Sequence, residues 1–196
     1  MAFKFKKNPI GLFDMLRTKH IGKKRQKMLS KGSLDELPKS DPTQDLAKNL
    51  HHPMKDFKII ETIPFGEDIM TIKFAPVDGS KLAFFKPGQY IAIQIKENDI
   101  LVTRPFTLSS SPNDAYEKGY YQVTIKKLDK GLFTTWLFKH AKIGAIVKIS
   151  SPLGDFAYNP IRDKKHIVCL AGGTGITPFV SMAKSIIYGS LKNVKM

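Results

Sequence analysis

The sequence of 196 residues is poor in the residues that build covalent or metal-held frameworks. Its single cysteine, Cys169, excludes an internal disulfide framework and a thiolate zinc cluster within the chain. No run approaches the roughly 20 apolar residues of a membrane-spanning helix, and charged residues interrupt the N-terminal stretch where a secretory signal needs an apolar core. These absences favour a reducing compartment and no membrane span, so the sequence predicts a cytoplasmic location.

Acidic residues are also scarce, with 17 Asp and Glu against 32 Lys and Arg. The first 31 residues hold ten Lys or Arg and one acid, Asp14, and so carry nine of the fifteen net positive charges. Here the stretch GLFDML could form a short helical turn, but it has no sustained period. We interpret residues 1–55 as a basic arm and linker. Such an arm could contact nucleic acid, an anionic membrane surface or an acidic protein, or be a solvated tail.

Six short runs rich in β-branched and aromatic residues follow the arm. They are residues 57–63, 69–75, 90–96, 106–108, 121–128 and 145–151. Turn signals such as PFGED, PVDGS and KPGQ separate them, and SPNDAYEKG is interpreted as a further turn. Short strands joined by tight turns favour an antiparallel barrel over a parallel sheet.

The fourth run belongs to the stretch RPFTLSSSP, residues 104–112. It places a fixed cation, an aromatic ring and several small hydroxyls on one short extended segment. That combination suits a planar ligand that carries phosphate, although a plain strand between two turns would explain the same residues.

Two helix starts are candidates for binding anions. The helix GLFTTWLFKH begins after Gly131 and has Thr134 in its first turn, where free N–H groups and the helix dipole attract phosphate. Ordinary capping by threonine is the alternative. Further along, an apolar strand over residues 167–171, a glycine turn and a helix form the front of a βαβ unit, with Pro178 replacing the third glycine of the dinucleotide fingerprint. This second turn either approaches a pyrophosphate or is purely structural.

The helix after that turn shows a 3.6-residue apolar period. Its predicted apolar face consists of Phe179, Met182, Ala183, Ile186 and Ile187.

Four motifs stand in the order RPFTLSS, GLFTTW, SPLGDF and AGGTGITP. With this order, the chain resembles the ferredoxin–NADP reductase family over about residues 56–189. The resemblance implies a mainly β fold: a six-stranded antiparallel Greek-key-type flavin-binding barrel, followed by the first βα unit of an α/β NAD(P)-binding domain. The expected domains are the arm and linker (1–55), the FAD-binding barrel (56–159) and the start of the NAD(P)-binding domain (160–196), which is incomplete.

Residue roles follow from the resemblance. It assigns Arg104 to the flavin phosphates, Phe106 to the isoalloxazine region and Thr107 to a contact near flavin N5. Many relatives have Tyr where this chain has Phe106, so a phenolic hydrogen bond to the flavin is lost. The other implied cofactor-binding residues, of the flavin and nicotinamide sites together, are Pro105, Ser109, Ser110, Gly131, Thr134, Gly172, Gly173, Thr174, Gly175 and Pro178. For Ser109 and Ser110, turn capping is the alternative role.

The implied function is a flavin-dependent oxidoreductase. FAD rather than FMN is the expected cofactor and NAD(P)H the co-substrate, with no metal and no catalytic acid or base from a side chain. Electrons would leave singly to an acidic redox partner such as ferredoxin, flavodoxin or a downstream iron–sulfur domain. The rival interpretations are a basic protein that binds nucleic acid or a membrane surface, and a fragment without activity of its own, since the chain stops one strand and one helix into the second domain.

Overall fold

The computed structural model describes residues 12–31 and 42–196, and the chain divides into two compact units, Met1–Asp41 and Pro42–Met196. In the first unit, α1 (Leu12–Leu29) is a single helix with exposed side chains from Lys19 to Met28. The sequence indicated only a short helical turn here, because the apolar residues have no helical period. Lys, Arg, Gln, Leu and Met nevertheless have good intrinsic helix propensity, which a search for an apolar stripe does not register.

The second unit begins with a helix inside the stretch interpreted as linker. This helix, α2 (Pro42–Leu50), starts at a proline, a residue that fits the first helical position because its missing N–H has no partner there. His52 follows it, is buried, and lies with its ring centroid 6.5 Å from that of Phe57. The interpretation of residues 30–55 as a linker did not include this helix.

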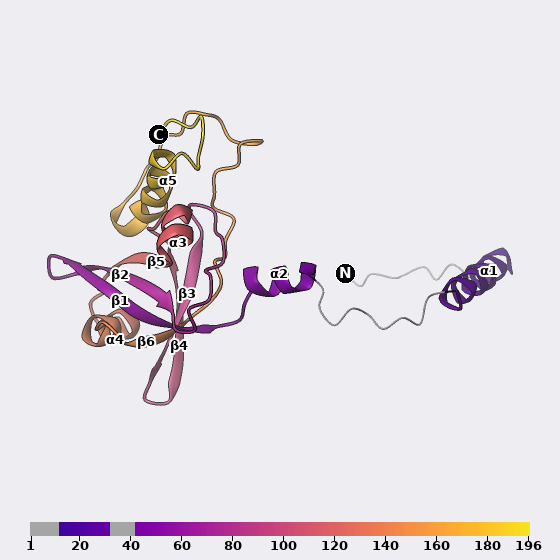
Figure 1. Cartoon of the computed structure of the whole chain (residues 1–196), viewed down its shortest axis with the longest axis horizontal. Coiled ribbons are helices and arrows are strands. Elements are labelled where there is room, and N and C mark those ends of the chain that lie inside the picture. The colour runs from indigo at the N-terminus through magenta and orange to yellow at the C-terminus, as the bar shows by residue number, and fades with distance from the viewer. Residues whose placement is uncertain (1–11, 32–41) are drawn as a thin grey trace, which may run out of the picture. The chain divides into compact units, whose positions relative to one another are not determined.

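Six strands form one antiparallel sheet in the order β4-β3-β6-β1-β2-β5 (Figure 1). The strands are β1 (Lys55–Phe65), β2 (Ile69–Pro76), β3 (Tyr90–Glu97), β4 (Ile100–Thr107), β5 (Tyr121–Lys126) and β6 (Ile146–Ile149). Because β6 inserts between β3 and β1, the connections are of the Greek-key type. A bridge between Leu108 and Val123 joins the segment after β4 to β5 and closes the sheet into a barrel. The predicted fold class is confirmed.

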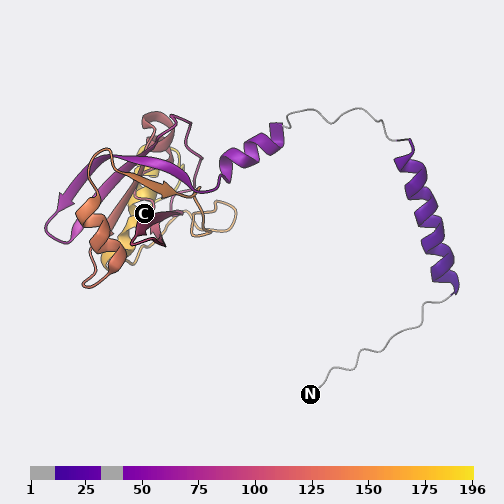
Figure 2. The same cartoon turned by 90° about the horizontal axis from the view of Figure 1, so that it is seen from below.

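Alternation along the strands produces the core. On β3, Ile91, Ile93 and Ile95 are buried, as the spacing predicts. Tyr121 is completely buried, and its phenol donates a 2.6 Å hydrogen bond to the carbonyl oxygen of Ala83. Burial raises the pKa of this phenol, so it remains a donor at neutral pH. Figure 2 shows the curved strands of the barrel from below.

Three helices and a 3₁₀ turn complete the unit. They are α3 (Pro112–Lys118), α4 (Leu132–His140), η1 (Gly173–Ile176) and α5 (Thr177–Ile187). The helix that became α4 was predicted to within one residue, whereas α3 lies in a stretch interpreted as a turn. In α3 the Ser111 hydroxyl accepts from Asp114 N, the Asp114 side chain accepts from Ser111 N, and Gly119 ends the helix in the left-handed conformation.

Residues 167–171 form no strand, so the prediction of an apolar strand here is wrong. Val168 and Leu170 are 86% and 88% exposed. The backbone pairs nearby only through an isolated parallel bridge between His166 and Lys195. A strand needs a neighbour to pair its backbone groups, and among the described residues no other strand lies beside this stretch.

The face of α5 that is buried also differs from the predicted one. Met182 is buried as expected, but Ile187 is 81% exposed, and the other buried residues of the helix are Thr177, Ser181 and Ser185.

The described helices include none that is long and apolar enough to cross a membrane. A cytoplasmic location stays a prediction.

Candidate functional site

Strand β4 and the start of α4 enclose a pocket of about 450 Å³. Segments that lie more than twenty residues apart in the sequence meet here, because β4 and the β5–α4 connection are neighbours in the barrel. The lining residues are Val102, Arg104, Pro105, Phe106, Leu128, Gly131, Leu132, Phe133 and Thr134. Five of the residues implied by the resemblance thus share one pocket.

The N-terminus of α4 opens into this pocket without a side-chain cap. Gly131 is the N-cap residue, and no side chain hydrogen-bonds to this helix end. The Thr134 hydroxyl accepts a hydrogen bond from Leu128 N at 3.1 Å and lies 3.4 Å from Gly131 O, so it braces the preceding turn instead. Thr135 N closes the first helical turn on Gly131 O, which leaves the N–H groups of residues 132–134 without helical partners. The helix start therefore offers donors and a positive dipole end to an anion.

Arg104 adds a full positive charge to the same pocket. Its side chain is exposed, and within the described residues its guanidinium makes a single hydrogen bond, from Nη1 to the carbonyl oxygen of Thr103 at 2.8 Å. None of the ion pairs in the described part of the chain involves Arg104. Most of its N–H groups are therefore available for a phosphate, which a planar guanidinium binds with two parallel hydrogen bonds.

Two aromatic rings give the pocket an apolar wall. The ring centroids of Phe106 and Phe133 lie 5.4 Å apart, with 34° between the ring planes. Phe133 is buried, whereas Phe106 is only partly buried and packs against the edge of the core. Cationic, dipolar and aromatic groups together suit a ligand with both phosphate and a flat apolar part.

Thr107 lies at the opposite end of the motif, beside a residue that the sequence did not single out. Its Cα partner across the ladder is Tyr90, the first residue of β3. Tyr90 exchanges two backbone hydrogen bonds with Leu153, at 2.9 and 2.8 Å. A Cβ added at Gly154 would lie 2.9 Å from the Tyr90 ring, so the loop packs directly on that ring. Tyr90 directly follows KPGQ, which was interpreted as a turn signal.

That turn is held against the SPLGDF loop. Gln89 Nε2 donates to Gly154 O at 2.8 Å. Gly88 has φ +105°, and a Cβ there would collide with the carbonyl oxygen of Phe156. Only glycine permits both this conformation and this approach, so the turn fixes where β3 begins and where Tyr90 lies.

Ser109 and Ser110 are buried in the barrel wall. The Ser109 hydroxyl lies 3.2 Å from the Thr124 hydroxyl, and the Ser110 hydroxyl accepts a 3.1 Å hydrogen bond from Gln122 N. Both hydroxyls are thus engaged with β5, and neither residue lines the pocket around Arg104. This arrangement favours the structural alternative for the pair.

The glycine loop is apart from that pocket. Gly172, Gly173, Thr174 and Gly175 are exposed in and before η1. Pro178 lies in the first turn of α5, and none of these residues lines the pocket around Arg104. The implied site residues therefore do not gather in one place: five line the pocket around Arg104, whereas those of the glycine loop, together with Thr107, Ser109 and Ser110, lie outside it.

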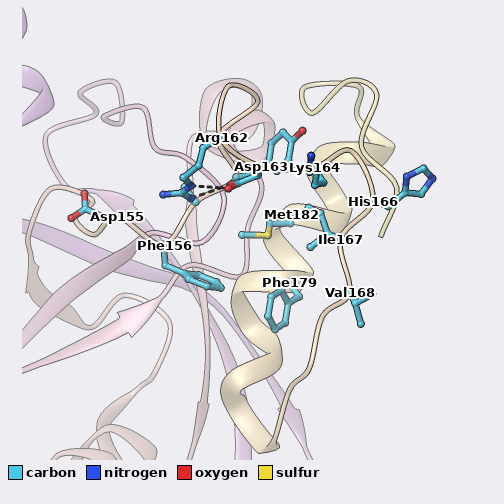
Figure 3. Close-up of a pocket in the computed structure, with 12 residues that line it drawn as sticks. Asp155, Phe156, Arg162, Asp163, Lys164, His166, Ile167, Val168, Phe179 and Met182 are labelled. Carbon is cyan, nitrogen blue, oxygen red and sulfur yellow. Dashed lines mark hydrogen bonds and ion pairs between the residues drawn. The ribbon is translucent and has the colours of Figure 1, made fainter.

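A larger hollow of about 730 Å³ lies between residues 155–168 and α5 (Figure 3). Phe156 and Phe179 meet edge to face on one side of it, with centroids 5.9 Å apart. Arg162 and Asp163 pair at 2.7 Å, and hydrogen bonding from Arg162 lowers the pKa of the Asp163 carboxyl. None of the cofactor-binding residues implied by the resemblance lines this hollow. Across the described residues, no group of three His, Cys, Asp or Glu gathers as metal ligands would.

Comparison with known proteins agrees with this geometry. Residues 56–158 match the family model described as the oxidoreductase FAD-binding domain. A flavohemoprotein of Candida albicans is 30% identical over 169 residues, which cover 84% of this chain and 41% of that protein. A flavohemoprotein of Oceanobacillus iheyensis is 32% identical over 139 residues, 68% of this chain and 33% of that protein. The chain thus spans between a third and about two fifths of these relatives.

Solved structures share the fold. The flavohem-like FAD/NAD-binding domain of nitric oxide dioxygenase from Vibrio cholerae aligns with a TM-score of 0.63 at 24% identity, over 71% of this chain and 60% of that one. A ferredoxin–NADP+ reductase from Neisseria gonorrhoeae with bound FAD and NADP aligns with a TM-score of 0.58 at 20% identity, over 67% of this chain and 50% of that one.

Proposed function

Because the chain belongs to the family of oxidoreductase FAD-binding domains, we propose that it binds FAD and passes electrons between NAD(P)H and a one-electron carrier. The observation that carries the proposal is the pocket between β4 and α4. An unpaired guanidinium, an uncapped helix start and two aromatic rings meet there. This donor set fits a dinucleotide, which brings two phosphates and extended flat rings.

Each element of the pocket would have a distinct task. Arg104 and the N–H groups at the start of α4 would hold the phosphates from two directions. Phe106 would pack against the isoalloxazine region, and Thr107 would hydrogen-bond near the reactive edge of the flavin. Tyr90, opposite Thr107 in the ladder, would line the same edge.

When bound, FAD supplies the redox chemistry, accepting a hydride and releasing electrons one at a time. The chain contributes position and electrostatics. A fixed positive charge and the helix dipole compensate the phosphate charge and anchor one end of the cofactor. Thr107 and Tyr90, which are partners in the barrel wall, would position the other end of the cofactor.

The glycine loop is proposed as the nicotinamide nucleotide site. Gly172, Gly173, Thr174 and Gly175 leave the backbone open to a pyrophosphate, and α5 begins directly behind them. The electron acceptor is proposed to be an acidic iron–sulfur protein or domain, or a flavodoxin, which the basic arm would attract. The named flavohemoproteins add a haem protein as a further class of acceptor.

The visible spectrum of the purified chain is the first test. A bound flavin gives a yellow protein, and heat should release a compound that co-chromatographs with FAD. Recovery of FMN would contradict the choice of dinucleotide. A colourless protein that also fails to bind added FAD would refute the proposal and favour the rival in which the basic arm is the functional part.

A further inference from the structure

Helix α5 is joined to the barrel by polar contacts, which is unusual for a helix with an apolar stripe. The Ser181 hydroxyl donates a 2.6 Å hydrogen bond to the backbone carbonyl of Ser110. One turn further along the helix, Lys184 Nζ donates to the carbonyl of Ser109 at 3.0 Å. Both acceptors lie directly after the segment that carries Arg104, Phe106 and Thr107.

The two donors are withdrawn from water. Ser181 is completely buried and Lys184 partly buried. Burial lowers the pKa of Lys184, and the nearby cations Lys73 and Lys118 lower it as well, whereas Asp114 raises it. Burying a lysine ammonium costs hydration free energy. The hydrogen bond from Lys184 to the Ser109 carbonyl offsets part of that cost, so we regard this contact as specific.

The acceptors are held equally firmly from the other side. Ser109 N donates to Gln122 O at 2.8 Å, and the Ser110 hydroxyl accepts from Gln122 N. The Ser109–Ser110 segment is thus fixed to β5 on one side and to α5 on the other. A change in the order of this segment must therefore reach α5.

We propose that Ser181 and Lys184 are positioning residues, which couple occupation of the flavin site to the order of α5 and of the glycine loop at its start. The inference rests on the proposed flavin site. Binding of FAD along residues 104–107 orders the strand end, the strand end presents the Ser109 and Ser110 carbonyls, and these fix the helix. The nucleotide loop is then held ready only when the flavin is in place, and by linkage an ordered loop favours flavin binding.

Amide hydrogen exchange of the flavin-free chain, before and after addition of FAD, tests the coupling. In the wild type, FAD should slow exchange both in residues 104–110 and in α5. In Ser181→Ala and Lys184→Met, slowing at 104–110 should persist, while the FAD-dependent slowing in α5 should fall about tenfold, the loss expected for one hydrogen bond to a charged or buried donor. Lys184→Arg keeps a cationic donor and should restore much of the effect.

Ser185→Ala is the matched control. Ser185 is as buried as Ser181, but its hydroxyl donates to Ser181 O within the same helix, so its removal should leave the FAD-dependent difference intact. A purely structural role for Ser181 would speed exchange equally with and without FAD, and that result would overturn the proposal. So would slowing at 104–110 in the wild type with none in α5. If FAD slowed exchange in neither region, the result would refute the flavin site itself, and this inference with it.

Discussion

Two helices of the second unit follow a glycine segment, and their surroundings are very different: α4 begins directly after Gly131, whereas α5 begins after Ile176, at the end of the 3₁₀ turn that contains Gly173 and Gly175. At α4, Gly131 is followed by a helix start that faces Arg104, Phe106 and the braced Leu128 turn. At α5, the glycines stand in an exposed 3₁₀ turn, and a Cβ added at Gly172, Gly173 or Gly175 would meet nothing within 4 Å. Both helix starts present backbone N–H groups, but of the two only the start of α4 lines the pocket around Arg104.

The comparison indicates that a helix start becomes a selective site only through the side chains around it. Backbone N–H groups supply donors and a partial charge at every helix N-terminus. Selectivity and retention require a fixed counter-charge and a surface that excludes water. We therefore expect α4 to hold its ligand in the present structure, and the loop before α5 to bind weakly by comparison.

Removing the counter-charge at α4 should have the largest effect. Arg104→Ala is expected to weaken FAD binding by roughly tenfold to a hundredfold, about 1.5–3 kcal/mol, because a charge-assisted contact to phosphate is lost. Lys126→Ala is the control, since Lys126 lies on β5, pairs with Asp68 at 3.3 Å and does not line the pocket. Titration of flavin fluorescence measures both. Equal affinities in the two variants would mean that Arg104 is an ordinary surface residue.

Adding one methyl group at the α4 start should have the next largest effect. A Cβ at Gly131 would lie 2.8 Å from Thr134 Oγ1 and 3.0 Å from Leu128 Cβ. Relief requires the threonine to abandon Leu128 N or the turn to move. Gly131→Ala should lower the free energy of unfolding by about 1–3 kcal/mol, as overpacking commonly does, and weaken FAD binding as well. Urea unfolding of the flavin-free protein checks the first effect, and unchanged stability would contradict the packing described.

The sequence alone was sufficient to predict the barrel. Period-two alternation at Ile91, Ile93 and Ile95 is a local signal for a strand with one buried face, and each such run found an antiparallel neighbour. Five of the residues that line the Arg104 pocket were named from motif order. These residues lie together only because β4 and the segment before α4 are neighbours in the barrel. The alternation of apolar residues within one strand does not specify which strands become neighbours.

Elements that depend on distant partners were not predictable in the same way. Residues 167–171 have the composition of a buried strand but no strand beside them, so they form no strand, and Val168 and Leu170 stay exposed. The orientation of Ser109 and Ser110 is set by Gln122 and Thr124, which no local pattern reveals. By contrast, the signal for α3 is local, yet it was missed. Ser111-Pro-Asn-Asp114 is a capping box, and Gly119 is a glycine that ends the helix.

Helix α3 offers a third start, one that its own side chains occupy. Burial by itself would raise the pKa of Asp114, but hydrogen bonds from Lys118 and Ser111 outweigh it and hold the pKa below its ordinary value. Asp114→Ala should lower the free energy of unfolding by about 1 kcal/mol, the usual loss for a capping residue. It should leave FAD affinity unchanged, because no residue of this helix lines the pocket around Arg104.

The pH dependence sharpens the test of α3. A carboxyl whose pKa is lowered by folding stabilises the protein above its unfolded pKa, about 3.9, and loses that contribution as pH falls through the lower folded value. The difference between wild type and Asp114→Ala should thus stay constant down to about pH 5 and shrink below about pH 4. Urea unfolding across this range measures it, and a difference that grew on acidification would contradict the assigned shift.

The smallest effect is expected at the loop before α5. The φ of Gly175 lies outside the left-handed region, and a Cβ there meets open space, so alanine requires neither strain nor repacking. Gly175→Ala should change the free energy of unfolding by less than about 0.5 kcal/mol, as expected for a surface substitution, and FAD affinity by less than about twofold. Both measurements are those used for Gly131→Ala, which makes the two glycines a matched pair. If Gly175→Ala released FAD as readily as Gly131→Ala does, the loop would have to contact the flavin, and the two helix starts would form a single site.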